Sequence, residues 1–363
     1  SEVNKRRNGN DMDLNRNHLI LSEPETQALH RFFNKYLFDV SMDVHEYSPY
    51  GGEWEQYGYR KNADVTLGTT TNPNVSEKIR TFSNDGVLPY VLKSLSVNNF
   101  SSLVYCPGGP PELDYIRHSN FDINDGRQSL GIQNTLSFIQ EGMNGKDMYV
   151  ENIKHRSEGQ MHGMRAMLEY VYLHKNEIKK LVASSRKALI TGKSNSPVSI
   201  QSEHVSNGQK LTLPLFSYST QTDTVVIVND YRPLVKSLYN VQKPAGYLIP
   251  KKNKELLEWA GKHAFITKDF KLQKGRKIEQ YIIRNIDSID FERDIIVNPI
   301  VETNDFPGGI VASEYLYIPT NQLKGNMIIL ALEPKSMLGL ITYKQYAHLL
   351  KTGEPFPVLR VIP

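Results

Sequence analysis

The sequence predicts an α/β protein in two parts: a mostly parallel or mixed sheet flanked by helices, and a smaller β-rich module at the C-terminal end. The chain has 363 residues, which allows about two domains at roughly 150 residues each. Strand-like and helix-like segments alternate up to about residue 190, as they do where helices cover both faces of a sheet. Beyond residue 206, short runs of strand-forming residues dominate.

The two predicted parts meet in a segment rich in serine, asparagine and glycine. Such a composition is typical of a linker or an exposed loop. We therefore expect an α/β domain at residues 1–190, a linker at 191–206 and a β-rich domain at 207–363.

The clearest helix start is Ser22-Glu23-Pro24-Glu25, where the serine can cap the helix and the proline falls in its first turn. Five apolar residues follow at helical spacing, and we expect them to form one buried face. These residues are Leu29, Phe32, Phe33, Tyr36 and Leu37.

Further elements follow from hydrophobic patterns in the first half. Strands are expected at residues 38–44, 101–105 and 135–140, a short helix at 87–95, and one long amphipathic helix at 155–189. In sheets of this kind, functional sites form beyond the C-terminal ends of the strands. Side chains that follow these strands are therefore the first candidates for chemistry.

Composition excludes several classes of protein. The net charge is only +4 and no basic stripe is interleaved with aromatic residues, so a nucleic-acid partner is not expected. No apolar run approaches the ~20 residues that a membrane helix needs, so no transmembrane segment is expected. The single cysteine, Cys106, excludes an internal disulfide framework.

A polar motif, Asp13-Leu14-Asn15-Arg16-Asn17, carries the most specific local signal. The planar guanidinium of an arginine can bind a carboxylate through two parallel hydrogen bonds, and a neighbouring asparagine adds a donor. An enzyme that recognises a free chain end needs such a clamp. The alternative is a loop arginine in a surface salt bridge.

Two strand ends carry further candidates. His45, in Asp43-Val44-His45, comes where a strand should end, and a histidine there can reach a metal ion through a ring nitrogen. Glu141 ends a strongly apolar strand, where a partly desolvated carboxylate suits a general base and acid. The alternatives are a hydrogen-bonded histidine and a solvent-facing glutamate.

These motifs together resemble the zinc carboxypeptidase family of carboxypeptidase A. Members carry an Asp-Leu-Asn-Arg-Asn block followed by a Ser-Glu-Pro-Glu-Thr helix start, and this chain has both, at residues 13–17 and 22–26. The run at 127–134 also agrees with larger members. The resemblance implies a zinc cofactor, hydrolysis of C-terminal residues, and peptide or protein C-termini as substrates.

The resemblance also implies roles for the strand-end residues and for the motif. His45 would be the third zinc ligand and Glu141 the general base and acid. Asn15 and Arg16 would bind the substrate's terminal carboxylate. Asp13 would orient a metal-binding histidine from behind.

Three more residues enter through the resemblance. Arg6 or Arg7 would match the arginine that polarises the scissile carbonyl. The spacing leaves both open, and we take Arg7 as the catalytic candidate and Arg6 as a substrate-binding one. Tyr115 would match a mobile tyrosine over the site.

The pattern breaks at the first pair of metal ligands. The family takes two ligands from a His-x-x-Glu element well before the Asp-Leu-Asn-Arg block, but only 12 residues precede Asp13. Two such strings, starting at His155 and His174, lie after Glu141, in the reverse order. We expect instead that the N-terminal third is absent, disordered or carried as a separate piece that partners this chain.

Two other functions remain open. One is a hydrolase of the same clan that acts on cell-wall peptides or acylated amino acids. The other is a non-catalytic peptide-binding module that holds no metal. From the family, we expect a bacterial protein that is periplasmic, on the cell surface or secreted.

Overall fold

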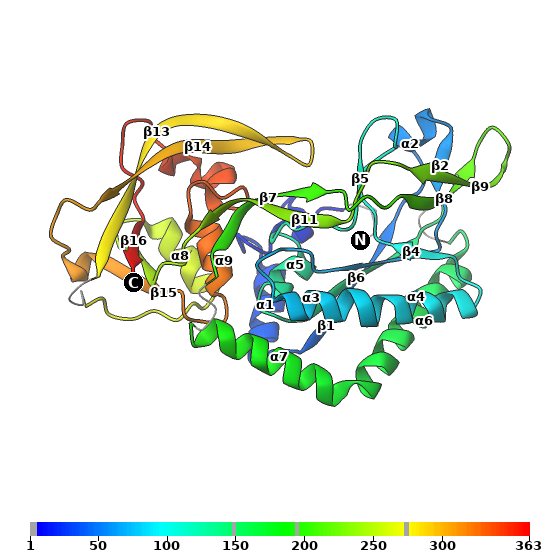
Figure 1. Ribbon diagram of the computed structural model, residues 1–363, viewed down its shortest axis with the longest axis horizontal. Helices are drawn as coiled ribbons and strands as arrows, with labels where there is room; N and C mark the ends of the chain where they lie inside the picture. Colours follow the sequence, from blue (N-terminus) through cyan, green and yellow to red (C-terminus); the bar gives the residue numbers. More distant parts are fainter. Residues whose placement is uncertain (1–5, 147–149, 193–195, 272–275) are drawn as a thin grey trace.

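The computed structural model describes residues 6–146, 150–192, 196–271 and 276–363. It has the predicted fold class, a mixed sheet flanked by helices together with separate antiparallel sheets (Figure 1). No helix in these ranges is long and apolar enough to span a membrane.

The main sheet has the strand order β1-β6-β3-β4. Its strands are β1 (Val40–Tyr47), β6 (Leu136–Met143), β3 (Val65–Thr69) and β4 (Ser102–Val104). β1 runs parallel to β6, β3 runs antiparallel to β6, and β4 runs parallel to β3. β6 is buried on both faces along its first five residues, which explains the continuous apolar character of its sequence.

Helices cover the main sheet, and the predicted elements in this half are largely confirmed. One helix differs, because the segment predicted as a single helix at 155–189 turns at His174, whose ψ of 15° is not helical, and forms α6 and α7. The helices are α1 (Pro24–Tyr36), α2 (Glu53–Gln56), α3 (Glu77–Thr81), α4 (Leu88–Val97), α5 (Gly126–Gly131), α6 (Ile153–Leu173) and α7 (Lys175–Ile190).

The predicted buried face of α1 is wrong. Phe33 is buried, but the other four apolar residues of that set are between 39% and 55% exposed. The helix instead buries Thr26, His30 and Phe33, which share a stripe at helical spacing. Hydrogen bonds explain this choice, because Thr26 Oγ1 bonds Asn17 and His30 Nε2 lies 3.0 Å from His18 Nδ1.

The expected linker also differs from the structure. Half of it is strand β7 (Val198–Val205), which is buried along its first five residues and pairs with β11 (Leu234–Val241). Strands β8 (Leu211–Ser217) and β9 (Thr222–Val228) then form a sheet with β2 (Tyr59–Lys61), so they pack onto the first half of the chain. The division into two domains stays a prediction.

The C-terminal part is β-rich and lies at the other end of the molecule (Figure 1). It holds a sheet with the order β14-β13-β16-β12-β15, together with helices α8 and α9. Their bounds are β12 (Gly246–Pro250), α8 (Lys254–Lys262), β13 (Lys277–Phe291), β14 (Asp294–Asp305), β15 (Tyr315–Pro319), α9 (Gly325–Leu332) and β16 (Leu359–Ile362). A two-residue pairing of β5 (Ile116–Arg117) with β10 (Tyr231–Arg232) adds a second link between early and late segments.

A buried charge network holds the C-terminal sheet to α9. Glu333 is 1% exposed and accepts hydrogen bonds from the hydroxyls of Tyr247 (2.6 Å) and Tyr281 (2.7 Å). The Arg360 guanidinium lies 3.0 Å from Glu333 and 2.8 Å from Glu279. Each buried charge therefore has an opposite charge and hydrogen-bond partners, as burial requires.

Candidate active site

The parallel pairing of β1 with β6 brings two candidate residues together. In this register His45 lies directly opposite Glu141, near the C-terminal ends of both strands. Neighbouring strands lie about 4.8 Å apart and residues opposite each other point to the same face. The imidazole and the carboxyl group therefore share one face at the strand ends, where sites form in such sheets.

His45 has a carboxylate partner on its own strand. Asp43 lies two residues earlier, on the same face, and its Oδ1 is 2.9 Å from His45 Nε2. The hydrogen bond that His45 donates to Asp43 raises the pKa of His45, against the opposing effect of burial. A carboxylate on one ring nitrogen is the usual arrangement that fixes a metal-binding histidine through its other nitrogen.

Glu141 is half-buried, and burial raises the pKa of its carboxyl group. His45, Arg127, Lys61 and Arg6 act in the opposite sense and lower this pKa. A carboxyl group whose pKa is raised is better suited to take up and return a proton.

Polar residues that the sequence did not suggest lie behind Asp43. A Cβ built on Gly126 would be 3.2 Å from both Asp43 Oδ2 and His18 Nε2, so these two groups are neighbours. The buried Arg127 bonds Asp125 Oδ2 at 2.9 Å and lowers the pKa of Asp43. In the sequence, these residues were marked only by the pair Gly126-Arg127 before a predicted apolar strand. Nothing in the sequence indicated that this pair lies beside Asp43 on β1.

The predicted carboxylate clamp is divided by the structure. Asn15 Oδ1 accepts a hydrogen bond from Gly126 N (2.8 Å) and so joins its loop to the start of α5. Arg16 is exposed and lines a polar cavity of about 410 Å³ with Asp122 and Glu292. Neither Asn15 nor Arg16 is among the residues that line the pocket beside Glu141.

The two arginines that precede the Asp13–Asn17 motif make different contacts. Arg6 Nε lies 2.7 Å from Asp13 Oδ2, and Arg6 lowers the pKa of both His45 and Glu141. Arg7 donates from Nη1 to the backbone oxygen of Asp11 (2.8 Å). Of these two arginines, Arg6 is therefore the one whose charge acts on His45 and Glu141. The sequence had favoured Arg7 for catalysis.

Asp13 contacts its own loop and Arg6. Besides its bond to Arg6, its Oδ1 accepts a hydrogen bond from the backbone of Asn15 (3.0 Å). A histidine partner is not among the contacts of Asp13 in the described part of the chain.

Tyr115 lies apart from Glu141. Its ring faces the guanidinium groups of Arg232 (4.1 Å) and Arg117 (6.0 Å), beside β5 and β10. It is not among the residues that line the pocket beside Glu141.

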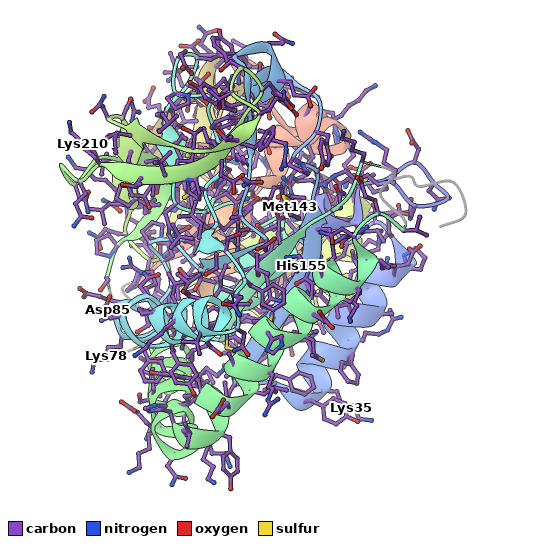
Figure 2. All side chains as sticks on the ribbon, turned by 90° about the vertical axis from the view of Figure 1, so that its right-hand side faces the viewer. Lys35, Lys78, Asp85, Met143, His155 and Lys210 are labelled. Atoms are coloured by element: carbon purple, nitrogen blue, oxygen red, sulfur yellow. The ribbon has the colours of Figure 1, made fainter. Side chains whose placement is uncertain are left out.

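The two alternative His-x-x-Glu strings differ in their contacts, since only the second pairs its histidine with its own glutamate. His155, on α6 where Figure 2 labels it near Met143, lies 2.9 Å from Asp64 Oδ1. His174 lies 3.3 Å from Glu177 at the turn between α6 and α7. Among the residues that the structure describes, no group of three histidine, cysteine, aspartate or glutamate side chains could hold a metal ion.

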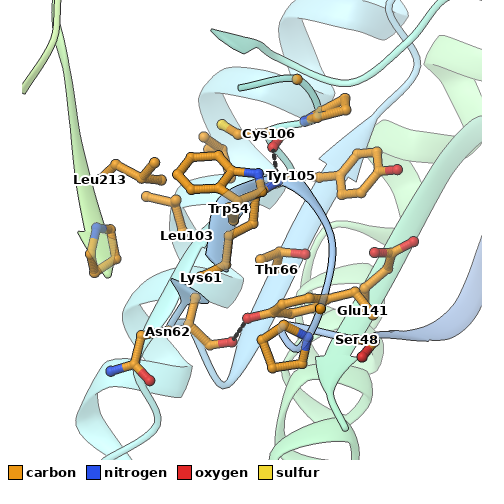
Figure 3. A pocket seen from close by; sticks show the side chains of 18 residues that line it. Ser48, Trp54, Lys61, Asn62, Thr66, Leu103, Tyr105, Cys106, Glu141 and Leu213 are labelled. Atoms are coloured by element: carbon orange, nitrogen blue, oxygen red, sulfur yellow. Dashed lines mark hydrogen bonds between the residues drawn. The ribbon is translucent and has the colours of Figure 1, made fainter. Parts of the chain in front are cut away.

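A pocket of about 310 Å³ opens beside Glu141, on the side of β3 and β4. Figure 3 shows Glu141 and Tyr105 on one side of it, Leu103 and Leu213 on the other, and Thr66 between them. A pocket of this size, mostly apolar with few polar groups, is typical of a small-ligand site.

Comparisons with known proteins agree with the class of function. No family model matches the chain, and no solved structure matches it significantly. Proteins named Carboxypeptidase 2 from Trichophyton tonsurans (21% identical), Trichophyton equinum (20%) and Trichophyton rubrum (21%) are similar over 97% of this chain. The chain spans about 65% of the length of these curated relatives. They are fungal, so they give no support to the expected bacterial origin.

Proposed function

We propose that this protein is a zinc-dependent carboxypeptidase that removes C-terminal residues from peptides or proteins, with Glu141 as its general base. The observation that carries the proposal is the β1–β6 register, which sets His45, with Asp43 behind it, opposite the half-buried Glu141. The similarity to proteins named carboxypeptidase over nearly the whole chain supports the same class.

The residues fit a metal ion in part. His45 would hold it, and because Asp43 contacts Nε2, the second ring nitrogen, Nδ1, would be the ligand atom. The described residues hold no set of three ligands. We therefore propose that a His-x-x-Glu element outside these residues, in a segment of the full-length gene product, completes the site.

The chain's own residues then carry the proton and the charges. When bound, zinc supplies a more acidic water and Lewis-acid polarisation of the scissile carbonyl. Glu141 accepts the proton of the attacking water and returns it to the leaving amine. Arg6, whose charge reaches both strand ends, stabilises the developing oxyanion, a role worth about 3 kcal/mol in comparable sites. Asn15 and Arg16 remain our candidates for the terminal carboxylate.

A turnover screen on the full-length gene product tests this function. We expect release of single C-terminal residues from peptides, together with zinc near one atom per chain by elemental analysis. Release of products from muropeptides or N-acyl amino acids alone would favour the hydrolase of the same clan. Peptide binding without zinc or turnover would favour the binding module.

A further inference from the structure

The pocket beside Glu141 lies over one end of a row of neighbouring residues that crosses the main sheet. Glu141 lies opposite His45 on β1 and opposite Thr66 on β3, and Thr66 lies opposite Leu103 on β4. Residues opposite each other share a face. A substrate whose scissile bond lies over Glu141 therefore has the candidate metal ligand on one side and this pocket on the other.

The walls of the pocket are mostly apolar, and one cation lies among them. Lys61 comes from β2, and its Nζ donates to the backbone oxygen of Cys106 (2.9 Å) and lies 5.3 Å from the centre of the Trp54 ring. An ammonium group has three hydrogens to donate. Since one hydrogen bond is seen within the described residues, the group has capacity to bind a further acceptor.

The electrostatics of Lys61 show that its charge is poorly compensated. Burial lowers the pKa of Lys61, and Cys106 and Glu141 offset this only in part. A buried charge without a full partner is costly, and an anion that enters the pocket would relieve that cost. Figure 3 shows the ammonium group beside Cys106 and Trp54.

A second polar group in the pocket also lacks a partner. Thr66 Oγ1 is buried and makes no hydrogen bond to any described residue. Buried hydroxyl groups are nearly always hydrogen-bonded, so this one is expected to find its partner in a ligand or a water. Lys61 and Thr66 thus offer donors to the same space.

We propose that this pocket receives the side chain of the substrate's C-terminal residue, and that Lys61, assisted by Thr66, selects an acidic one, aspartate or glutamate. The inference rests on the proposed carboxypeptidase function. It names the substrate class from the chemistry of the pocket: apolar walls for the methylene groups and a cation with a hydroxyl for the carboxylate.

Peptides that differ only in their last residue test the proposal on the full-length protein. We expect kcat/KM for a peptide ending in glutamate to exceed that for the same peptide ending in glutamine by about tenfold or more, since a charged acceptor is lost. Lys61→Met should remove this preference and improve the leucine-ended peptide, and Lys61→Glu should favour a lysine-ended one. Lys93→Met, at an exposed lysine on α4, is the matched control and should keep the wild-type preference.

Three outcomes would overturn the inference. A wild-type protein that hydrolyses both peptides equally has no acidic preference. A uniform loss with Lys61→Met across all last residues would assign Lys61 to the terminal carboxylate instead. If no peptide is hydrolysed, the proposed function fails, and calorimetric binding decides the pocket: tighter binding of the glutamate-ended peptide that depends on Lys61 supports the inference, and equal binding refutes it.

Discussion

The substitution Gly163→Ala tests how α6 supports the strand ends of the candidate site. A Cβ at this position would lie 2.7 Å from Cδ of Gln140 and closer still to its Oε1. Gln140 precedes Glu141 and is completely buried, and its Nε2 donates to Gln160 O (2.9 Å) and Oε1 (2.6 Å). Gln160 Nε2 in turn donates to the backbone oxygen of His45 (2.5 Å). The added methyl group therefore disturbs a chain of contacts that reaches both β6 and β1.

The magnitude follows from three terms. Alanine gains about 0.5–1 kcal/mol over glycine within a helix. Overpacking a tight core costs about 1–3 kcal/mol, and displacing Gln140 breaks two buried hydrogen bonds at about 0.5–1.5 kcal/mol each. We expect Gly163→Ala to lower the free energy of unfolding by about 1–5 kcal/mol, and to lower kcat if the site is catalytic.

The matched control is Gly261→Ala in α8, where a Cβ would have no neighbour within 4 Å. The same chemical change should there stabilise the protein by up to about 1 kcal/mol. Urea unfolding followed by far-UV circular dichroism measures both variants. Shifts of the two midpoints in the same direction would refute the reasoning.

Three further predictions follow from other parts of the structure. Glu333→Gln should cost about 1.5–3 kcal/mol, because it removes one of the two carboxylate partners of the buried Arg360 guanidinium and leaves Glu279 as the other. Glu302→Gln, at an exposed ion pair, should cost less than about 1 kcal/mol, and urea midpoints compare the two variants. Burial raises the pKa of Asp122 to about 7, so between the lower pKa of the unfolded state and this value the folded state keeps a proton that the unfolded state has lost. The free energy of unfolding should therefore fall as the pH rises through this window. In Asp122→Asn, the free energy of unfolding should depend less steeply on pH. Asp43→Asn removes the carboxylate behind His45 and should weaken zinc binding by the full-length protein by about 10- to 100-fold in a chelator competition; unchanged affinity would contradict a supporting role.

Sequence patterns predicted the two strands that carry His45 and Glu141 because those patterns are local, although both strands continue further than expected, to Tyr47 and Met143. The apolar run before Glu141 and the short strand before His45 each have a period that identifies a strand, and the structure has strands there. Two neighbouring parallel strands then bring their ends together without further information. The fold class was predictable for the same reason.

The rest of the site depends on long-range packing that no local pattern carries. Lys61 enters the pocket because β2 pairs with β8, whose residues lie more than 150 positions further along the chain. Arg16 lines a cavity whose other walls come from residues 120–124 and from the C-terminal part of the chain, so its surroundings could not be read from its motif. On α1, the apolar spacing was helical, but the buried stripe was decided by hydrogen bonds of Thr26 and His30.

Replacement of Glu141 by glutamine in the full-length protein tests the central claim most directly. The measurement is the release of C-terminal residues from a peptide, with zinc content determined on the same sample. Because glutamine keeps the shape but cannot take up the proton, we expect kcat to fall by at least about 100-fold while bound zinc is unchanged. Undiminished turnover by Glu141→Gln would contradict the account.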